Sequence, residues 1–527
     1  MRFSIDSAQS RDALLMGWGW YLSDEAGNQA VALELDFSDG IRQTVSCLVN
    51  RARDDVVQAF PANPHASTAG FIFLSKLESR SNVVSARLLI SLSNGTNERY
   101  PLQGFPEKFS PDSIAAQAVL TRIQKVWRLA KSGRVPYLLE RLQGALKQSY
   151  SRATSLPVHS ALPQGNVDLV FDHNLGGGAN KFRQEKIAQL LQLGKEVVLV
   201  TFDLPRLLYR LKIHQSRNRH DEEFEDLQVL RDRLSQTRYA TIHVNNFVSY
   251  PDPLDMLQLV NRLMRQSQGQ LEVYLHDFLP VCPSFTLINA QGRYCGIPTA
   301  ETCTVCLSTN KTIFPSFVML KEITPWRLAW TELLQAATKI IAFSQSTVDI
   351  FQMAFPVNNW QGKVVVQPHV INVTSYPKIK PQLHEPLKVA VIGNINFPKG
   401  ASVVHDLLAL IASKQLPVSI VVIGTLERYV TSPALTVTGP FENSALPKLL
   451  EQHCIGVCWL PSICPETFSY VTEEIITMEM PLVCFDLGAP AGRVRRYRFG
   501  AVARETSAQS ALDAIMSLAH RVAVESA

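Results

Sequence analysis

Two glutamates eight positions apart, Glu466 and Glu474, stand where a short apolar strand gives way to a helix. The strand is predicted over Gly456 to Leu460, and Pro465 ends it, so that Glu466 begins the helix. A helix start offers free N–H groups and the positive end of the helix dipole, which together bind a diphosphate. Eight positions span ~12 Å of helix, so the two acids can hold opposite ends of a long ligand. An ordinary acidic first turn is the alternative interpretation.

A second anion-binding junction is predicted earlier in the chain. The apolar strand Leu387 to Ile392 runs into Gly393 and Asn394 and then into Lys399, ahead of an amphipathic helix. Lys399 carries a positive charge on a long stem, which can follow the oxygens of a departing pyrophosphate as negative charge develops on them.

Together, these two motifs resemble those of retaining glycosyltransferases of the GT-B fold, in particular family 4 and its polysaccharide-building, rhamnosyltransferase-like members. The family's Gly-Arg-Leu-x-x-x-Lys-Gly loop matches residues 393 to 400, and its Glu-x7-Glu motif matches Glu466 to Glu474. The resemblance covers residues 166 to 527 and implies that a nucleotide diphosphate sugar binds here. The implied donor-binding residues are Gly393, Asn394, Lys399, Glu466, Thr467, Phe468, Ser469 and Glu474.

One position departs from the family pattern. Asn394 stands where the family usually has arginine, so one of two cations expected on the diphosphate is missing. Arginines that follow the strand Leu482 to Phe485 can approach the phosphate in its place, or can form a solvated basic turn. These are Arg493, Arg495, Arg496 and Arg498.

The expected fold class is α/β, with two Rossmann-like doubly wound lobes of the GT-B type behind an all-β sandwich domain and a helical linker. Short aromatic and aliphatic runs separated by turn residues favour the sandwich, and alternating buried strands and amphipathic helices from Asn166 onward favour the parallel sheets. The predicted domains are a sandwich (1–108), a basic helical linker (109–165), an acceptor lobe (166–380) and a nucleotide-sugar lobe with a C-terminal crossover helix (381–527).

Polar residues also follow strands of the predicted acceptor lobe. A glycine-rich turn after the first strand lets a substrate approach the backbone, and its residues are Gly176, Gly177, Gly178 and Asn180. His276 and Asp277 directly follow the strand Leu271 to Leu275, which places them at the cleft edge. The resemblance implies that His276 contacts the sugar or the acceptor, and we assign it a positioning role. The expected catalytic residues are His276, Asp277, Lys399 and Glu466.

Four cysteines lie within a Pro- and Gly-rich stretch and can close one tetrahedral site: Cys282, Cys295, Cys303 and Cys306. Four thiolates predict a structural zinc with no open position for water. An iron–sulfur cluster and unligated thiols are the alternatives. No cofactor is expected for catalysis.

Composition limits the classes of function. Charged residues make up 18% and hydrophobic residues 46%, as in a soluble globular protein, and no secretory leader or membrane-spanning run is recognisable. We therefore expect a cytoplasmic protein. Residues 115–152 are basic and amphipathic, so they predict either a solvated linker helix or peripheral contact with the inner face of a membrane. No nucleic-acid partner is expected, because no aromatic platform accompanies the charge.

The sequence thus predicts a retaining glycosyltransferase that moves a hexose or deoxyhexose from a nucleotide diphosphate sugar to a surface polysaccharide, such as lipopolysaccharide, or a lipid-linked glycan. Two alternatives stay open. One is a non-catalytic glycan-binding or scaffold protein, and the other is a nucleotide-sugar epimerase or hydrolase, which the placement of both glutamates on one helix disfavours.

Overall fold

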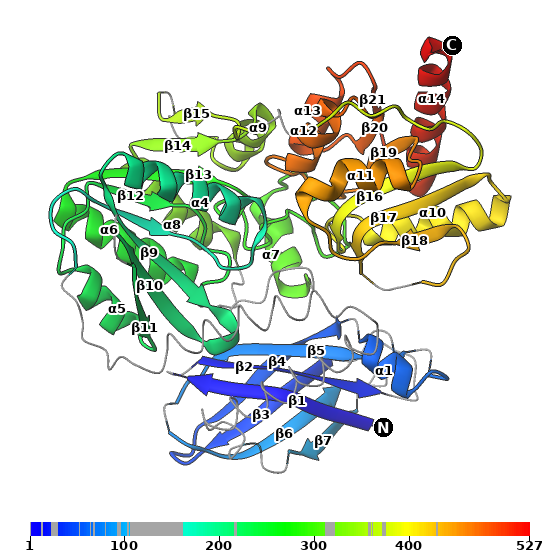
Figure 1. Cartoon of the computed structure of the whole chain (residues 1–527). Coiled ribbons are helices and arrows are strands. Elements are labelled where there is room, and N and C mark those ends of the chain that lie inside the picture. Colours follow the sequence, from blue (N-terminus) through cyan, green and yellow to red (C-terminus); the bar gives the residue numbers. More distant parts are fainter. Residues whose placement is uncertain are drawn as a thin grey trace. The chain divides into compact units, whose positions relative to one another are not determined.

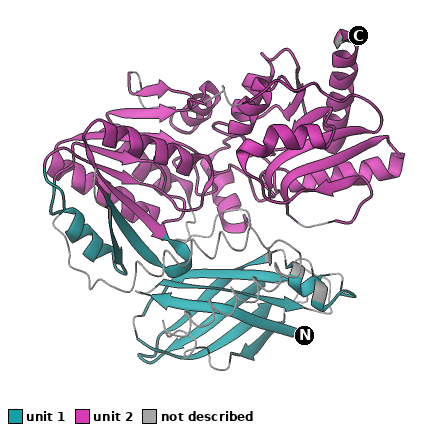
Figure 2. Cartoon of the chain, viewed as in Figure 1, with its two compact units in different colours: residues 1–164, 203–213, 218–237 teal, residues 165–202, 214–217, 238–527 magenta. Residues whose placement is uncertain are grey.

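The computed structural model describes residues 2–526, apart from two long and several short segments. The segments left out are 12–13, 23–29, 52, 64, 67–68, 80, 92–95, 103–104, 106–161, 216–218, 311–321, 357–359, 361, 372–375 and 428–429. The chain forms two compact units (Figure 2). The first contains residues 1–164, 203–213 and 218–237, and the second contains 165–202, 214–217 and 238–527.

The N-terminal part of the first unit is an antiparallel sheet of seven strands in the order β1-β2-β5-β4-β3-β6-β7 (Figure 1). The strands are β1 (Arg2–Arg11), β2 (Leu14–Leu22), β3 (Ala30–Phe37), β4 (Arg42–Arg51), β5 (Gly70–Lys76), β6 (Val83–Ser91) and β7 (Asn97–Pro101). Buried side chains alternate along β6, and six of the strands contribute to one core. Because β4 pairs with both β3 and β5, the seven strands join into one sheet, and the sandwich that the sequence predicts here stays a prediction.

The remaining elements of the first unit are short. They are α1 (Asp54–Ala59), η3 (Leu204–Arg206), β10 (Leu208–His214), β11 (Arg219–Phe224) and α5 (Leu227–Leu234).

The second unit contains two parallel sheets, and we call the part from β8 to β15 the first lobe. Its strands pair in the order β9-β8-β12-β13-β14-β15 (Figure 1). The elements are β8 (Val167–Phe171), α4 (Gly177–Gln192), β9 (Glu196–Asp203), β12 (Thr241–Val244), α6 (Pro253–Ser267), β13 (Gln270–Leu275), α7 (Ala300–Thr309), α8 (Ile323–Ala336), β14 (Lys339–Ala342), α9 (Gln345–Ala354) and β15 (Val364–Val366). β8 is buried along its whole length, as expected for a strand inside a parallel sheet.

The second lobe extends from β16 to α14, and its six parallel strands have the order β18-β17-β16-β19-β20-β21. The elements are β16 (Leu387–Ile395), α10 (Ala401–Lys414), β17 (Val418–Leu426), β18 (Leu435–Val437), η5 (Asn443–Ala445), α11 (Leu446–Gln452), β19 (Val457–Leu460), α12 (Tyr470–Thr477), β20 (Leu482–Phe485), α13 (Gly488–Val494), β21 (Gly500–Ala503) and α14 (Ala508–Ser526). This is the doubly wound order, in which the chain winds outward first to one side of β16 and then to the other.

The helix that follows the glycine-rich turn, α4, begins inside the glycine triplet at Gly177. The helix predicted to begin at Glu466 begins later. α12 begins at Tyr470, because the Ser469 hydroxyl caps it by accepting from the Thr472 N–H. Glu466 therefore lies in the turn before the helix and not in the helix itself, so the prediction that one helix carries both glutamates is wrong.

The C-terminal helix α14 packs on the second lobe. Its residues Ala511, Leu512 and Ile515 join the core formed by β16, β17 and α10. The expected crossover between the two halves is therefore replaced by packing within one lobe.

Residues 109–161 of the predicted linker, which include its basic segment 115–152, lie outside the described residues. Within the part of the chain that the structure describes, no helix combines the length and the apolar character needed to cross a bilayer.

Candidate functional site

The strand order of the second-lobe sheet reverses between β16 and β19. In doubly wound sheets, ligands bind beyond the carboxyl ends of the strands at this point, where loops leave in opposite directions and open a crevice. Lys399 follows β16 and Glu466 follows β19. The Lys399 Nζ lies 3.0 Å from Glu466 Oε2, so the two predicted motifs meet at the reversal point.

Gly400 lets the loop that carries Lys399 approach the end of β19. It precedes α10 with φ of 86°, and a Cβ at this position would lie 1.9 Å from the Pro461 carbonyl oxygen. The Ile463 N–H also donates to the Pro398 carbonyl at 3.0 Å. The loop with the lysine and the turn with the glutamate are therefore packed against each other through their backbones.

The charges of this pair are balanced. Burial favours the neutral form of Lys399, but the Glu466 carboxylate outweighs this effect and raises the pKa of the lysine. The other carboxylate oxygen of Glu466 accepts from the Ser462 hydroxyl. Lys399 keeps 47% of its side chain exposed and has three N–H donors, so it can contact a phosphate while it remains paired with Glu466.

Gly393 and Asn394 form part of the end of β16, where the sequence predicts a loop. The exposed Asn394 side chain accepts from the Thr425 hydroxyl at 2.6 Å. Three of the four arginines that could replace its missing charge have carboxylate partners: Arg493 with Glu473, Arg495 with Asp486 and Arg498 with Glu525. The described contacts therefore bring no second cation to Lys399.

The turn between Glu466 and α12 contacts the first lobe. The Thr467 hydroxyl donates to the His276 carbonyl at 2.7 Å, and the Thr467 carbonyl accepts from the Thr347 hydroxyl at 3.3 Å. Phe468 packs against a first-lobe cluster that contains Tyr274 and Phe343. These side chains hold the two lobes together at the turn.

Glu474 is only 3% exposed. Its carboxylate accepts from the Tyr376 hydroxyl at 3.0 Å, and burial raises its pKa. Tyr376 belongs to the segment that joins the lobes. The structure therefore surrounds Glu474 with protein, and the hydrogen bond described for its carboxylate joins it to Tyr376 and not to Lys399.

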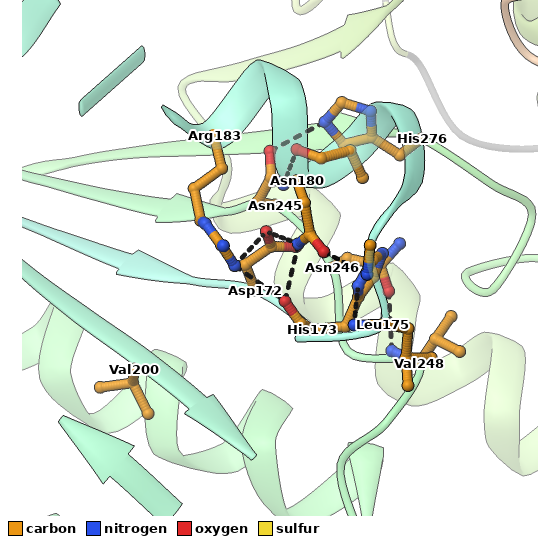
Figure 3. Close-up of polar contacts among 12 residues, drawn as sticks. Asp172, His173, Leu175, Asn180, Arg183, Val200, Asn245, Asn246, Val248 and His276 are labelled. Atoms are coloured by element: carbon orange, nitrogen blue, oxygen red, sulfur yellow. Dashed lines mark hydrogen bonds and ion pairs between the residues drawn. The ribbon is translucent and has the colours of Figure 1, made fainter. Parts of the chain in front are cut away.

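In the first-lobe sheet, the strand order reverses between β8 and β12, and β13 is the next strand after β12. His276 and Asp277 follow β13, and Asn245 and Asn246 follow β12. The His276 Nε2 lies 2.8 Å from Asn245 Oδ1, and Asn246 donates to an Asp277 carboxylate oxygen at 2.6 Å. Figure 3 shows Asn245 beside His276. Neither asparagine was predicted as a site residue, because the strand before them, Thr241–Val244, has only four residues and gives no clear periodic pattern.

The environments of the histidine and the aspartate favour their neutral forms. Burial, together with nearby His369 and His173, lowers the pKa of His276 well below its usual value. Burial also raises the pKa of Asp277 to about 6, against the opposing hydrogen bonds from the Leu279 N–H and from Asn246. Near neutral pH, His276 is therefore uncharged. Asp277 changes between its neutral and charged forms near pH 6.

The glycine turn lies at the end of β8. Gly176 and Gly177 are exposed and have positive φ of 86° and 81°. Gly178 faces the second lobe, since a Cβ there would lie 3.0 Å from the Tyr470 ring. Asn180 is buried, and its amide accepts from the Gly176 N–H and donates to Asp172 and the His173 carbonyl (Figure 3). These hydrogen bonds of Asn180 fix the shape of the glycine turn.

A cavity of about 740 Å³ lies beside this region, between the end of β14 with α9 and the helices α12 and α13. Phe468 and Ser469 line it, together with Phe343, His369 and Arg496. Its lining does not include Lys399 or His276. Of the predicted donor residues, Phe468 and Ser469 line this cavity, Lys399 and Glu466 meet at the reversal point, and Glu474 contacts Tyr376.

The four cysteines proposed as zinc ligands do not form a ligand set. Among the residues that the structure describes, no group of three or more His, Cys, Asp or Glu side chains is placed to hold a metal ion. Burial raises the pKa of Cys282 to about 12, and the neighbouring thiols of Cys295, Cys303 and Cys306 add to this effect. The structure therefore does not support the zinc prediction.

No protein-family model matches the sequence, and neither does any curated protein. Among solved structures, Anabaena HepE in complex with UDP and glucose is similar at 14% identity and a TM-score of 0.41, over 66% of this chain and 89% of that one. A glycosyltransferase from Rickettsia africae is similar at 12% identity and 0.42, over 68% and 88%. TarM is similar at 11% and 0.37, over 59% and 57%. These sequence identities and TM-scores are too low to assign an activity to this chain.

Proposed function

We propose that this protein is a glycosyltransferase of the GT-B type that uses a nucleotide diphosphate sugar as its donor. The observation that carries the proposal is the contact of 3.0 Å between Lys399 and Glu466, from adjacent strands at the reversal point of the second-lobe sheet. A cation and a carboxylate at such a crevice suit a ligand that has a diphosphate at one end and sugar hydroxyls at the other.

In this proposal, the second lobe holds the donor. Lys399 neutralises charge on the departing diphosphate, and the Glu466 carboxylate accepts from hydroxyls of the transferred sugar. Because the exposed Asn394 contributes an amide and no charge, Lys399 carries most of the electrostatic stabilisation. No metal takes part in the transfer.

The first lobe holds the acceptor, a surface polysaccharide or a lipid-linked glycan. The exposed glycines at positions 176 and 177 allow close approach to the backbone, and His276 and Asp277 orient hydroxyl groups. Transfer proceeds with retention. The acceptor attacks from the face that the phosphate leaves, the departing phosphate takes the acceptor proton, and the protein holds the geometry.

A transfer assay tests the proposal. Purified protein is incubated with radiolabelled nucleotide sugars and a membrane extract, and the label is followed into lipid, polymer and free sugar. Label in lipid or polymer, with the anomeric configuration retained, supports the transferase. Label in free sugar alone would identify a hydrolase, and binding without turnover would identify a glycan-binding protein; either outcome contradicts the proposal.

We further propose that the protein acts in the cytoplasm and contacts anionic lipid through residues 115–152. The support is the clustering of lysine and arginine among apolar residues at helical spacing. Co-sedimentation of the full chain with phosphatidylglycerol vesicles, and not with phosphatidylcholine vesicles, is the expected result. Equal sedimentation with both would rule out the electrostatic contact.

A further inference from the structure

Two neighbouring strands of the first lobe end in pairs of polar residues that contact each other in matching order. The first residue after β12, Asn245, meets the first residue after β13, His276, and the second residues, Asn246 and Asp277, meet in the same way. β12 and β13 are parallel neighbours in which Val244 lies opposite Val273, so both contacts are shifted by two residues from the register of the strands.

The contacts of Asn245 determine which end of its amide faces the histidine. Its Nδ2 lies 3.4 Å from the Ala179 carbonyl, in the first turn of α4, so the NH₂ group points there. The Oδ1 atom therefore faces His276 Nε2 at 2.8 Å. An amide oxygen can only accept, so Nε2 must carry the hydrogen.

The groups around the His276 ring determine whether its other nitrogen, Nδ1, is protonated. An amide partner offers no negative charge that would stabilise an imidazolium, and His369 and His173 further lower the pKa of His276. By contrast, the neighbouring His243 has Asp168 at 3.0 Å and Glu272 at 3.2 Å from its two nitrogens. A neutral His276 with hydrogen on Nε2 keeps a free lone pair on Nδ1.

The rings around His276 restrict its rotation. Phe343 stacks on it with centroids 4.5 Å apart, and Phe182 meets it edge-on at 5.0 Å. No hydrogen bond joins Nδ1 to any residue that the structure describes, and the side chain is partly exposed. The lone pair is therefore available to a ligand.

We propose that Asn245 is a positioning residue that holds His276 as the neutral Nε2–H tautomer and leaves Nδ1 to accept a hydrogen bond from a sugar hydroxyl. The tautomer follows from contacts within the lobe alone. The role of Nδ1 toward a hydroxyl rests on the proposed function. As a neutral acceptor, Nδ1 orients the hydroxyl without removing its proton.

Nuclear magnetic resonance of the full chain labelled with ¹⁵N-histidine tests the tautomer directly, with His276→Gln used to assign the signal. Near neutral pH we expect an unprotonated Nδ1 and a protonated Nε2. Asn245→Leu, which has no acceptor, is expected to give a mixture of tautomers, whereas Asn166→Leu, an exposed position in the same lobe, is expected to leave the signal unchanged. A protonated Nδ1 in the wild type, or an unchanged signal in Asn245→Leu, would overturn the proposal.

The wild-type spectrum decides the tautomer even if Asn245→Leu does not fold, and Asn245→Ala, which also has no acceptor, then replaces it as the variant. The hydroxyl role is tested with a nucleotide sugar that the transfer assay identifies. In that assay we expect Asn245→Leu to lower kcat/KM by roughly tenfold or more, because Nδ1 of His276 no longer orients the sugar hydroxyl. Unchanged kinetics with an altered spectrum would refute the hydroxyl role alone. Absence of any transfer would count against the proposed function and leave the tautomer result intact.

Discussion

Lys399 is the residue through which the proposed function is tested most directly, because it is the cation nearest to the expected diphosphate and its side chain is half exposed. We expect Lys399→Ala to lower donor binding or turnover at least tenfold, a loss of ~1.4 kcal/mol. Isothermal titration with nucleoside diphosphates and the transfer assay measure this change.

The matched control is Lys414→Ala. Lys414 is also exposed and in the same lobe, but it contacts Gln509 and lies at the far end of α10. This variant is expected to bind and turn over the donor as the wild type does. Equal effects of the two substitutions would remove Lys399 from the site.

Asp277 gives a prediction about pH. Its folded pKa of about 6 lies above the ordinary value of 3.8, so the folded state favours the protonated form. The stability from this group is present at low pH and is lost as the pH rises through 6. We expect the free energy of unfolding of Asp277→Asn, relative to wild type, to increase between pH 4 and 7 by up to about 3 kcal/mol.

Urea denaturation of both proteins across this pH range measures that difference. Subtraction of the two curves cancels the contributions of the other titrating groups. Asparagine loses one of the two hydrogen bonds that the carboxylate accepts from Leu279 and Asn246, which gives an offset independent of pH. A difference with no slope would show that Asp277 is ionised as an ordinary carboxylate.

At the scale of single elements, loop backbones decide whether the site forms. Gly400 combines a left-handed backbone with close contact to Pro461, so no other residue fits without displacement of the loop. We expect Gly400→Ala to destabilise the protein by more than about 2 kcal/mol and to weaken donor binding, because the loop also carries Lys399. Thermal denaturation and titration measure the two effects.

Gly492→Ala is the control for this substitution. Gly492 lies within α13, and a Cβ there meets no atom within 4 Å. Alanine favours a helix over glycine by about 0.5 to 1 kcal/mol, so this variant is expected to be as stable as the wild type or more so. If both variants behaved alike, the contact between the two loops would not be a constraint.

At the scale of the second unit, Thr467 links the lobes through its hydroxyl bond to the His276 carbonyl. We expect Thr467→Val to expose the backbone on both sides of this contact. The rate of amide hydrogen exchange there should rise roughly tenfold, because losing the hydrogen bond lowers the free energy of local opening by about 1 kcal/mol or more. Hydrogen exchange of peptides that contain residues 276–280 and 464–470 measures the change. Thr467→Ser keeps the hydroxyl and should restore protection, and equal protection in all three proteins would show that the bond does not hold the lobes.

Hydrophobic pattern predicted much of the secondary structure. The strand predicted over Leu482 to Phe485 forms with the same bounds and is buried along its whole length, because a continuous apolar run inside a parallel sheet is covered on both faces. The strand predicted over Leu271 to Leu275 also forms, as the buried part of β13. The strand Thr241–Val244, which carries the two asparagines at its end, was missed. At only four residues it is too short to give a clear periodic signal.

The sequence by itself determined which polar residues stand at strand ends, since that property is local: Lys399, Glu466, His276 and Asp277 each follow an apolar strand. Only the tertiary structure decided which of them meet. Lys399 and Glu466 are 67 positions apart and pair because β16 and β19 are neighbours in the sheet, a consequence of how the chain crosses over. Tertiary packing also buries Glu474 against Tyr376, which lies 98 positions earlier in the chain. Apolar pattern specifies that a face is buried but not which surface covers it, and for that reason the partners could not be predicted.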